Sequence, residues 1–321
     1  MKRSSRHEKT DAPSRNEVKA ARHPRPSHRR AIDRSGLLLV APAVLLVAAF
    51  TLYPFAHALY TSTQLSSPII DAKFVGLQNY HDVITSSYFL DAAKTTALFT
   101  AVSVPVLVVL GVLVAVLLNE PFFGNTFLRA GMLLPWAIPA AAAGVIWQWV
   151  FLDDSGALNV SLYSLGVIEE YVPWLTTPEL ARMAVVIVFI WTQLPLVSIL
   201  LLAALQAVSK DLYDAAAVDG ASALGRFRYI TLPGIRPMLV IVTVYEILMA
   251  LATFDLTYSL TGGGPGTATT LLAYFIWSET FNQLSFGQGA ALAVLIALAS
   301  LVAIFVILRA LPDDALLGED R

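Results

Sequence analysis

Six stretches of the chain are long and apolar enough to cross a lipid bilayer. A membrane-spanning helix needs about 20 mostly apolar residues. The chain is 57% hydrophobic and 14% charged, whereas a soluble domain holds about 45–50% apolar and about 25% charged residues. The sequence therefore predicts an all-α fold, a polytopic bundle of six transmembrane helices. The six stretches are Gly36–Ala58, Thr96–Leu118, Arg129–Leu152, Ala181–Leu205, Met238–Leu260 and Gly287–Leu308.

The distribution of basic residues sets the orientation of these helices. Lys and Arg favour the cytoplasmic side of short loops. With both termini in the cytoplasm, eighteen basic residues lie inside and three lie outside, namely Lys73, Lys94 and Arg182. The reverse orientation would invert this bias. The sequence therefore predicts an N-in, C-in topology.

Residues 1–34 form a basic tail. They carry eleven Lys or Arg against four acidic residues, are rich in Ser, Pro and His, and lack apolar periodicity. We expect a disordered, solvated cytoplasmic tail that helps to orient the first span. A nucleic-acid-binding arm is the alternative, but the tail runs directly into a membrane span. The predicted organisation is then this tail, a transmembrane domain over 35–310 with a cytoplasmic loop at 206–237, and a short cytoplasmic tail over 311–321.

The first stretch also has features of a cleaved secretory signal. A basic region precedes an apolar run, and Ala56-His57-Ala58 resembles a cleavage site. The apolar run and the tail before it are longer than in a typical signal, so we interpret the segment as a permanent span.

Several kinds of chemistry lack support in the sequence. The chain contains no cysteine, which excludes disulfides, zinc–thiolate sites and thiol catalysis. None of its lysines follows a glycine, as the phosphate-binding loop of an ATPase requires. We find neither a paired-histidine metal spacing nor a Gly-x-Ser-x-Gly nucleophile motif. The sequence predicts a protein that is not an enzyme and holds neither metal nor cofactor.

The loop between the fourth and fifth stretches has the pattern of a helical hairpin. Ser209 can cap a helix with Asp211 in its first turn. Gly220 suits a left-handed residue that ends this helix, and a second short helix can follow from Ser222. We expect prolines 233 and 237 to break the chain before the fifth span. Small side chains on one face suit insertion into a groove of another protein.

This loop resembles the coupling motif of binding-protein-dependent importer permeases, written Glu-Ala-Ala, three residues, Gly, nine residues, Ile-x-Leu-Pro. Six of its seven marked positions match, and Asp replaces Glu at the first. The motif positions are Asp214, Ala215, Ala216, Gly220, Ile230, Leu232 and Pro233. The resemblance extends over residues 35–310 and is closest to the sugar branch of that family, of the maltose and glycerol-3-phosphate importer type.

Such a resemblance implies a set of partners and a location. The permease would lie in the bacterial cytoplasmic membrane and pair with a second, homologous permease, more usually a different chain. Two copies of a cytoplasmic ABC ATPase would bind the motif loop and hydrolyse the ATP, and an extracytoplasmic solute-binding protein would deliver the solute. The chain itself would need no cofactor and would bind no nucleic acid.

Polar residues at membrane depth are candidates for the solute path, because they are costly there unless paired or functional. The candidates are Gln193, Glu246, Asp255 and Tyr258. Trp147, Gln148, Trp149 and Trp191 offer aromatic faces and hydrogen-bonding groups, although an aromatic belt or packing is the plainer explanation. Glu246 either lines a polar path or pairs with the partner permease.

Three functional hypotheses follow. The first is a carbohydrate importer permease that works by alternating access. The second is an ion-coupled carrier that acts without an ATPase and uses Glu246 or Asp255; such carriers often show internal repeats, and none is clear here. The third, a polytopic membrane enzyme, would need titratable residues gathered at one membrane face, which the sequence does not offer. The transported solute is not specified by the sequence.

Overall fold

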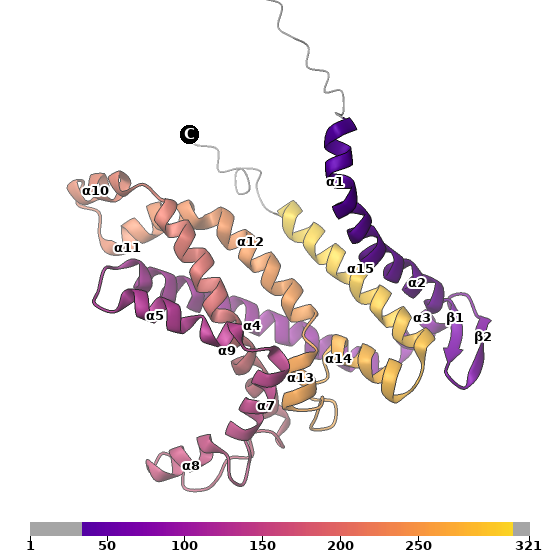
Figure 1. The fold of residues 1–321 in the computed structure, drawn as a ribbon. Coiled ribbons are helices and arrows are strands. Elements are labelled where there is room, and N and C mark those ends of the chain that lie inside the picture. The colour runs from indigo at the N-terminus through magenta and orange to yellow at the C-terminus, as the bar shows by residue number, and fades with distance from the viewer. Residues whose placement is uncertain (1–33, 311–321) are drawn as a thin grey trace, which may run out of the picture. The chain divides into compact units, whose positions relative to one another are not determined.

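A computed structural model describes residues 34–310, and the predicted helical membrane bundle is confirmed (Figure 1). The chain divides into two compact units at Pro54/Phe55. The predicted terminal tails, apart from Arg34, lie outside the described residues. Five helical segments are long and apolar enough to cross a membrane, and a bent helix pair brings the number to six.

The first span consists of three consecutive segments, α1 (Arg34–Val47), a π-helical turn (Ala48–Leu52) and α2 (Tyr53–Ser62). A second π-helical turn covers Phe227–Thr231. Each of these turns ends two residues before a proline, Pro54 or Pro233. A proline ring inside a helix collides with the carbonyl four residues earlier. The wider π-helical turn relieves this collision and keeps the helix continuous.

The second and fourth spans form the centre of the larger unit. They are α4 (Ser87–Asn119) and α9 (Pro178–Ala207), and both contact α12 (Leu232–Leu251). Leu107 and Leu201 are fully buried between them. The rings of Phe99 and Phe189 meet edge to face, with centroids 5.1 Å apart. These contacts hide the apolar faces of α4 and α9 that do not meet lipid.

The third predicted span, Arg129–Leu152, is sharply bent. It consists of α5 (Asn125–Met132), α6 (Leu134–Ala137) and α7 (Ala140–Val150), with a bend of 95° between the two halves. The cause is local, because the residue before a proline is driven out of the helical region. Ile138 accordingly has φ −78° and ψ 127°, just before Pro139.

The fifth predicted span, Met238–Leu260, is not one continuous helix in the structure. One helical segment runs without interruption from α11 (Ala223–Arg226) through α12 to Leu251, so Pro233 and Pro237 do not break the chain. The π-helical turn over Phe227–Thr231 accommodates Pro233 within this continuous segment. The chain then leaves the helix, and α13 (Asp255–Leu260) forms a separate element.

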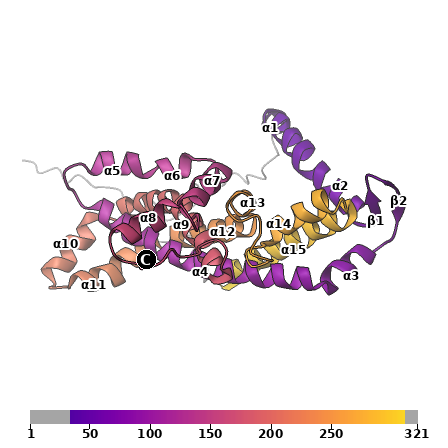
Figure 2. The same cartoon turned by 90° about the horizontal axis from the view of Figure 1, so that it is seen from below.

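The sixth span, α15 (Phe286–Ala310), is clamped at its first turn. Its neighbours are helix α3 (Gln78–Thr85) and strand β1 (Gln64–Ser67), which pairs with the antiparallel strand β2 (Ile70–Phe74). The buried Asn79 donates to the carbonyl oxygens of Ser62 and Gln64, both at 2.8 Å. Figure 2 shows α15 beside α14 (Leu272–Trp277), which continues into a π-helical turn over Ser278–Asn282.

Candidate coupling surface and solute path

The loop between α9 and α12 forms the predicted helical hairpin. Its first helix is α10 (Lys210–Val218), and Ser209 caps it as expected, with Oγ accepting from the Asp211 N–H at 3.3 Å. Its second helix, α11, is capped by Ser222, whose Oγ accepts from the Gly225 N–H at 3.1 Å. We call residues 209–233 the coupling hairpin. The hairpin extends from the end of α9 and α12 in Figure 1.

Gly220 ends α10 in the left-handed conformation that the sequence predicts, with φ +77°. The N–H of Ala221 donates to Ala216 O at 2.8 Å, and the N–H of Gly220 donates to Ala217 O at 3.1 Å. This pair of bonds is the Schellman arrangement. A Cβ atom added at Gly220 would meet nothing within 4 Å, so this side of the turn is open.

One contact braces the hairpin internally, and another joins the ends of the two spans at its base. The hydroxyls of Tyr213 and Thr231 lie 3.0 Å apart and join α10 to the turn that begins the fifth span. Gly234 lies so close to Val208 that an added Cβ would be 2.7 Å from Val208 Cγ2. Movement of α10 is therefore passed directly to α9 and α12. Tyr213 and Thr231 adjoin motif positions, but the sequence pattern did not single them out.

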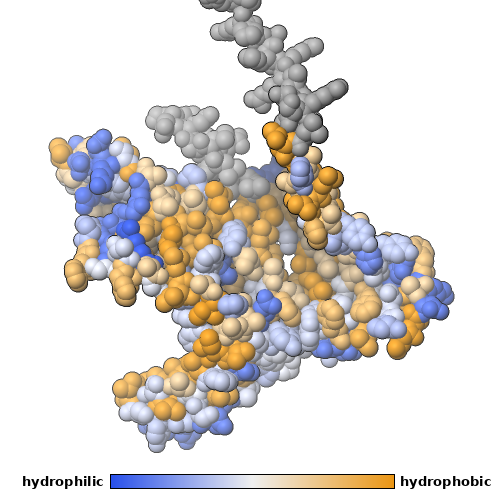
Figure 3. Space-filling view, in the orientation of Figure 1, coloured by the Kyte–Doolittle hydropathy of each residue, from blue (hydrophilic) through white to orange (hydrophobic). Residues whose placement is uncertain are grey.

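The outer face of the hairpin combines exposed apolar and acidic groups. Val218 is 89% exposed, and Leu212, Leu224 and Tyr229 are also largely exposed. Asp214 is exposed as well, and no ion pair among the described residues involves it. Figure 3 shows blue and orange side by side over this part of the molecule. Exposed apolar residues rimmed by charge mark protein-binding surfaces.

A hollow of about 740 Å³ lies behind α10. Its walls come from the ends of α4 and α9 and from the hairpin, and it has charges of both signs, Glu120 and Asp214 against Lys210 and Arg226. Asp214 therefore lies at the junction of the hollow and the exposed face. Among the other motif residues, Ala215, Leu232 and Pro233 are exposed and Ala216 and Ile230 are half-buried.

The candidate path residues do not form one cluster. Gln193 lies on α9 and Glu246 on α12, and the structure shows no hydrogen bond between them. Glu246 is 0% exposed, and both carboxyl oxygens lack a hydrogen-bond partner among the described residues. Gln193 Oε1 is likewise buried and without a partner. Asp255 and Tyr258 lie apart on α13, where both are exposed.

The other aromatic candidates are divided between packing and exposure. Trp147 and Trp191 meet edge to face, with centroids 5.4 Å apart, and Trp147 also contacts Phe151. Trp149 is 70% exposed. The packed Trp147–Trp191 pair therefore helps to hold α7 against α9. This arrangement agrees with a packing role for these two residues rather than with contact to the solute.

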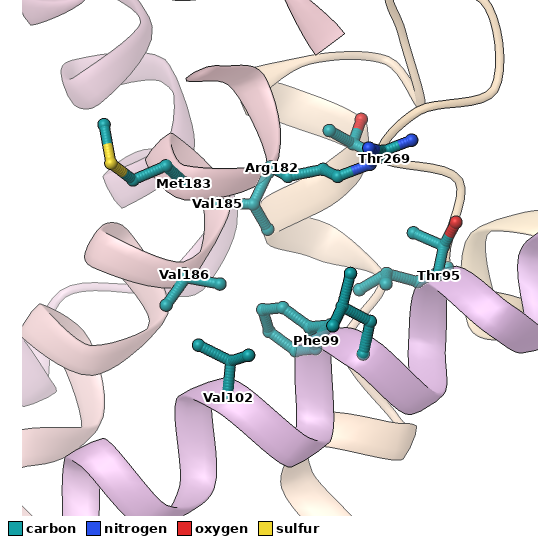
Figure 4. A pocket seen from close by; sticks show the side chains of 10 residues that line it. Thr95, Phe99, Val102, Arg182, Met183, Val185, Val186 and Thr269 are labelled. Atoms are coloured by element: carbon teal, nitrogen blue, oxygen red, sulfur yellow. The ribbon is translucent and has the colours of Figure 1, made fainter. Parts of the chain in front are cut away.

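A smaller pocket of about 210 Å³ lies between α4 and α9 (Figure 4). Phe99 and Val102 on one helix face Val185 and Val186 on the other. Arg182 borders the pocket, but its Nε donates to Ala268 O at 3.0 Å. A nearly wholly apolar lining offers few partners for sugar hydroxyls. Within the part of the chain that the structure describes, no three His, Asp or Glu side chains gather as a metal site requires.

Comparison with solved structures shows the same fold. A bacterial ABC transporter that imports the acidic polysaccharide alginate superposes with a TM-score of 0.75 over 87% of this chain and 96% of that chain, at 23% sequence identity. A second structure, the alginate transporter in complex with a pentasaccharide-bound periplasmic protein, gives the same TM-score over 86% of this chain and 94% of that chain. The similarity in these two structures is one of architecture.

Sequence comparison places the chain in a family. It is 38% identical over 276 residues to the sulfoquinovosyl glycerol transport system permease protein of Agrobacterium fabrum, covering 85% of this chain and 89% of that protein. It is also 38% identical to the trehalose/maltose transport system permease protein of Thermococcus litoralis, over 81% of this chain and 88% of that protein. The profile of binding-protein-dependent transport system inner membrane components matches residues 107–316. The chain belongs to this family of inner membrane transport components.

Proposed function

We propose that the chain is the transmembrane permease subunit of an ATP-binding-cassette importer that carries a carbohydrate across the cytoplasmic membrane by alternating access. The family membership supports the transport role. The names of the relatives, which concern sulfoquinovosyl glycerol, trehalose and maltose, support a sugar or glycoside as the solute. The ion-coupled carrier has no comparable support.

The observation that carries the coupling mechanism is the open face of the coupling hairpin, which is fastened to two spans. Each ATPase of the importer is proposed to receive one hairpin in a surface groove, with Asp214, Ala215, Ala216 and Gly220 at the contact. Ile230, Leu232 and Pro233 form the link to α12. Closure of the ATPases on ATP then moves α9 and α12 together, because the Tyr213–Thr231 bond ties α10 to the turn that leads into α12, and Gly234 of α12 packs against Val208 at the end of α9.

The other partners follow from the same proposal. A second, homologous permease completes the membrane portion, and an extracytoplasmic solute-binding protein releases the solute at the end of the bundle opposite the hairpin. Hydrolysis takes place in the ATPase subunits, so this chain is proposed to have no enzymatic activity. In the orientation that places the hairpin inside, both termini are cytoplasmic, and the basic tail over 1–34 lies on the same side.

Gln193 and Glu246 remain proposals for the solute path. Gln193 Oε1 and both carboxyl oxygens of Glu246 have no hydrogen-bond partner among residues 34–310, and an unsatisfied polar group is costly at membrane depth. Since Glu246 is fully buried, α12 must move before solute or the partner permease can reach its carboxyl group. Asp255 and Tyr258 are accessible without such a movement.

The test is reconstitution of the permease with its partner permease, ATPase and binding protein in proteoliposomes. We expect radiolabelled trehalose, maltose or lactose to accumulate only when the ATPase and ATP are both present. Omission of the ATPase is the matched control. Accumulation that persists without the ATPase, driven by a proton or sodium gradient, would refute the importer and support the carrier.

A further inference from the structure

Five aromatic rings form one continuous cluster at the end of α12 that is remote from the coupling hairpin. The rings of this aromatic cluster come from the start of α13 (Asp255–Leu260) and the residue before it, from α14, and from the π-helical turn after α14. The ring of Trp277 contacts each of the other four, at centroid distances of 4.8–6.4 Å. The rings of Phe254 and Tyr274 are stacked, with 22° between their planes. The five residues are Phe254, Tyr258, Tyr274, Trp277 and Phe281.

The position of this cluster follows from the length of α12. A helix rises about 1.5 Å per residue, so the 20 residues of α12 span about 30 Å, the thickness of the hydrocarbon core. The hairpin precedes this helix, and Phe254 follows it. If the hairpin is cytoplasmic, the cluster lies at the outer mouth of the bundle.

Part of the cluster is accessible. Tyr258 is 49% exposed and Phe281 is 62% exposed. Two acidic residues accompany the rings in sequence, the exposed Asp255 beside Phe254 and the half-buried Glu279 two residues after Trp277. Burial, and then the neighbouring Tyr258, raise the pKa of the Tyr274 hydroxyl. The accessible surface thus combines flat aromatic faces with tyrosine hydroxyl groups.

The loop over 261–270 fixes the orientation of one ring. Hydrogen bonds within this glycine-rich loop hold it closed. Thr270 Oγ1 donates to Gly263 O at 3.0 Å, and Thr269 Oγ1 donates to Gly264 O at 2.8 Å. A Cβ added at Gly263 would lie 2.6 Å from Tyr274 Cε1, so the backbone packs directly against this ring. The loop therefore acts as a rigid support for the cluster.

We propose that the aromatic cluster is a stacking platform for neutral sugar rings at the outer mouth of the permease. This inference rests on the proposed carbohydrate function. A pyranose ring presents C–H groups on its faces and hydroxyl groups at its edge. Such a ring matches a surface of aromatic faces bordered by a few polar groups, which is the usual composition of a small-molecule site. The platform receives the sugar from the binding protein before α12 opens the deeper path.

An aromatic belt in the lipid headgroup region is the competing explanation, because Trp and Tyr gather there. Belt residues act singly, each with its polar end in the headgroups. In this cluster the rings contact one another across the start of α13, α14 and the following π-helical turn, and a hydrogen-bonded loop supports them. These features favour a built surface over separate lipid anchors.

The test is saturation-transfer NMR on the assembled importer in nanodiscs, without the binding protein, with trehalose, maltose and lactose as probes. Saturation of the aromatic protons should reach the C–H protons of at least one sugar. For that sugar, Tyr258→Leu combined with Phe281→Leu should raise the apparent Kd about tenfold, the scale of one or two lost ring contacts. Tyr258→Phe, which keeps the ring face, should stay near the wild-type affinity.

Tyr163→Leu is the matched control. Tyr163 is 54% exposed on α8 (Ala157–Ser164), before the first turn of α9, and its ring contacts Tyr171 rather than the cluster. It should leave the apparent Kd unchanged. Absence of transfer to all three sugars in the wild-type importer, or an equal Kd in the Leu variants, would overturn the platform. ATP-driven sugar accumulation in the same preparation would then leave the proposed function intact, whereas its absence would count against both.

Discussion

Gly220→Trp should reduce ATP-dependent sugar accumulation by at least about tenfold and leave the amount of permease in the membrane unchanged. The substitution has two effects on the coupling hairpin. A side chain in the left-handed region costs about 1–2 kcal/mol, which the hairpin can tolerate locally. The added side chain starts in open space, since a Cβ at this position has nothing within 4 Å. The indole therefore occupies space that we assign to the ATPase.

Gly166→Trp is the matched control for this experiment. Gly166 also has a positive φ, +70°, and its Cβ direction is also empty, but it follows α8 at the other end of α9. The backbone strain is comparable in the two variants, so a difference between them reports the added bulk. If both variants accumulated equal sugar and retained equal ATPase on purification, Gly220 would not lie at the contact surface with the ATPase.

Gly144→Leu should prevent stable folding of the bundle. Gly144 lies on α7 against α13, and a Cβ atom added there would overlap Ser259 Oγ and lie 3.2 Å from the backbone nitrogen of Leu260. Overpacking of a tight interface costs about 1–3 kcal/mol and occasionally more. Because backbone is among the obstructing atoms, relief requires α13 to move away from α7. We expect lower membrane levels and earlier thermal aggregation, followed by fluorescence-detected gel filtration.

Gly131→Leu controls for the loss of a helical glycine. Gly131 lies in α5, and nothing lies within 4 Å of a Cβ added there. We expect its thermal profile to match the wild type or to improve slightly, since glycine weakens a helix interior. If Gly144→Leu and Gly131→Leu had the same stability, the close packing of α7 on α13 would be in error.

The sequence predicts the spans and the hairpin well because both depend on local physics. Continuous apolar length determines α4, α9 and α15, and the cap at Ser209 and the left-handed turn at Gly220 follow from short-range preferences. The places where a span bends are harder to predict. Pro139 bends its span by 95°, whereas Pro233 is absorbed by a π-helical turn within a continuous helix. Proline restricts the backbone in both places, and only the surrounding packing decides between a bend and an adjustment.

The candidate sites also combine features that local sequence predicts with features that only the fold determines. The spacing of the motif places its residues on one hairpin, but it cannot reveal the Tyr213–Thr231 bond, which joins residues 18 positions apart. Tyr258 is recognisable as a polar aromatic residue near a helix end. Its neighbours Tyr274, Trp277 and Phe281 come from a later part of the chain, and only the fold of the 261–270 loop brings them to it.

Cysteine cross-linking tests the contact between the coupling hairpin and an ATPase most directly. The natural chain has no cysteine, so a single introduced thiol reports one position. Val218→Cys lies on the hairpin at a site that is 89% exposed, and Val167→Cys, after α8, replaces a valine that is 65% exposed. With a short bifunctional reagent, the account predicts a permease–ATPase product from position 218, sensitive to ATP, and none from position 167. Cross-linking of position 218 only to extracytoplasmic protein, or labelling of this thiol from outside the cell, would contradict it.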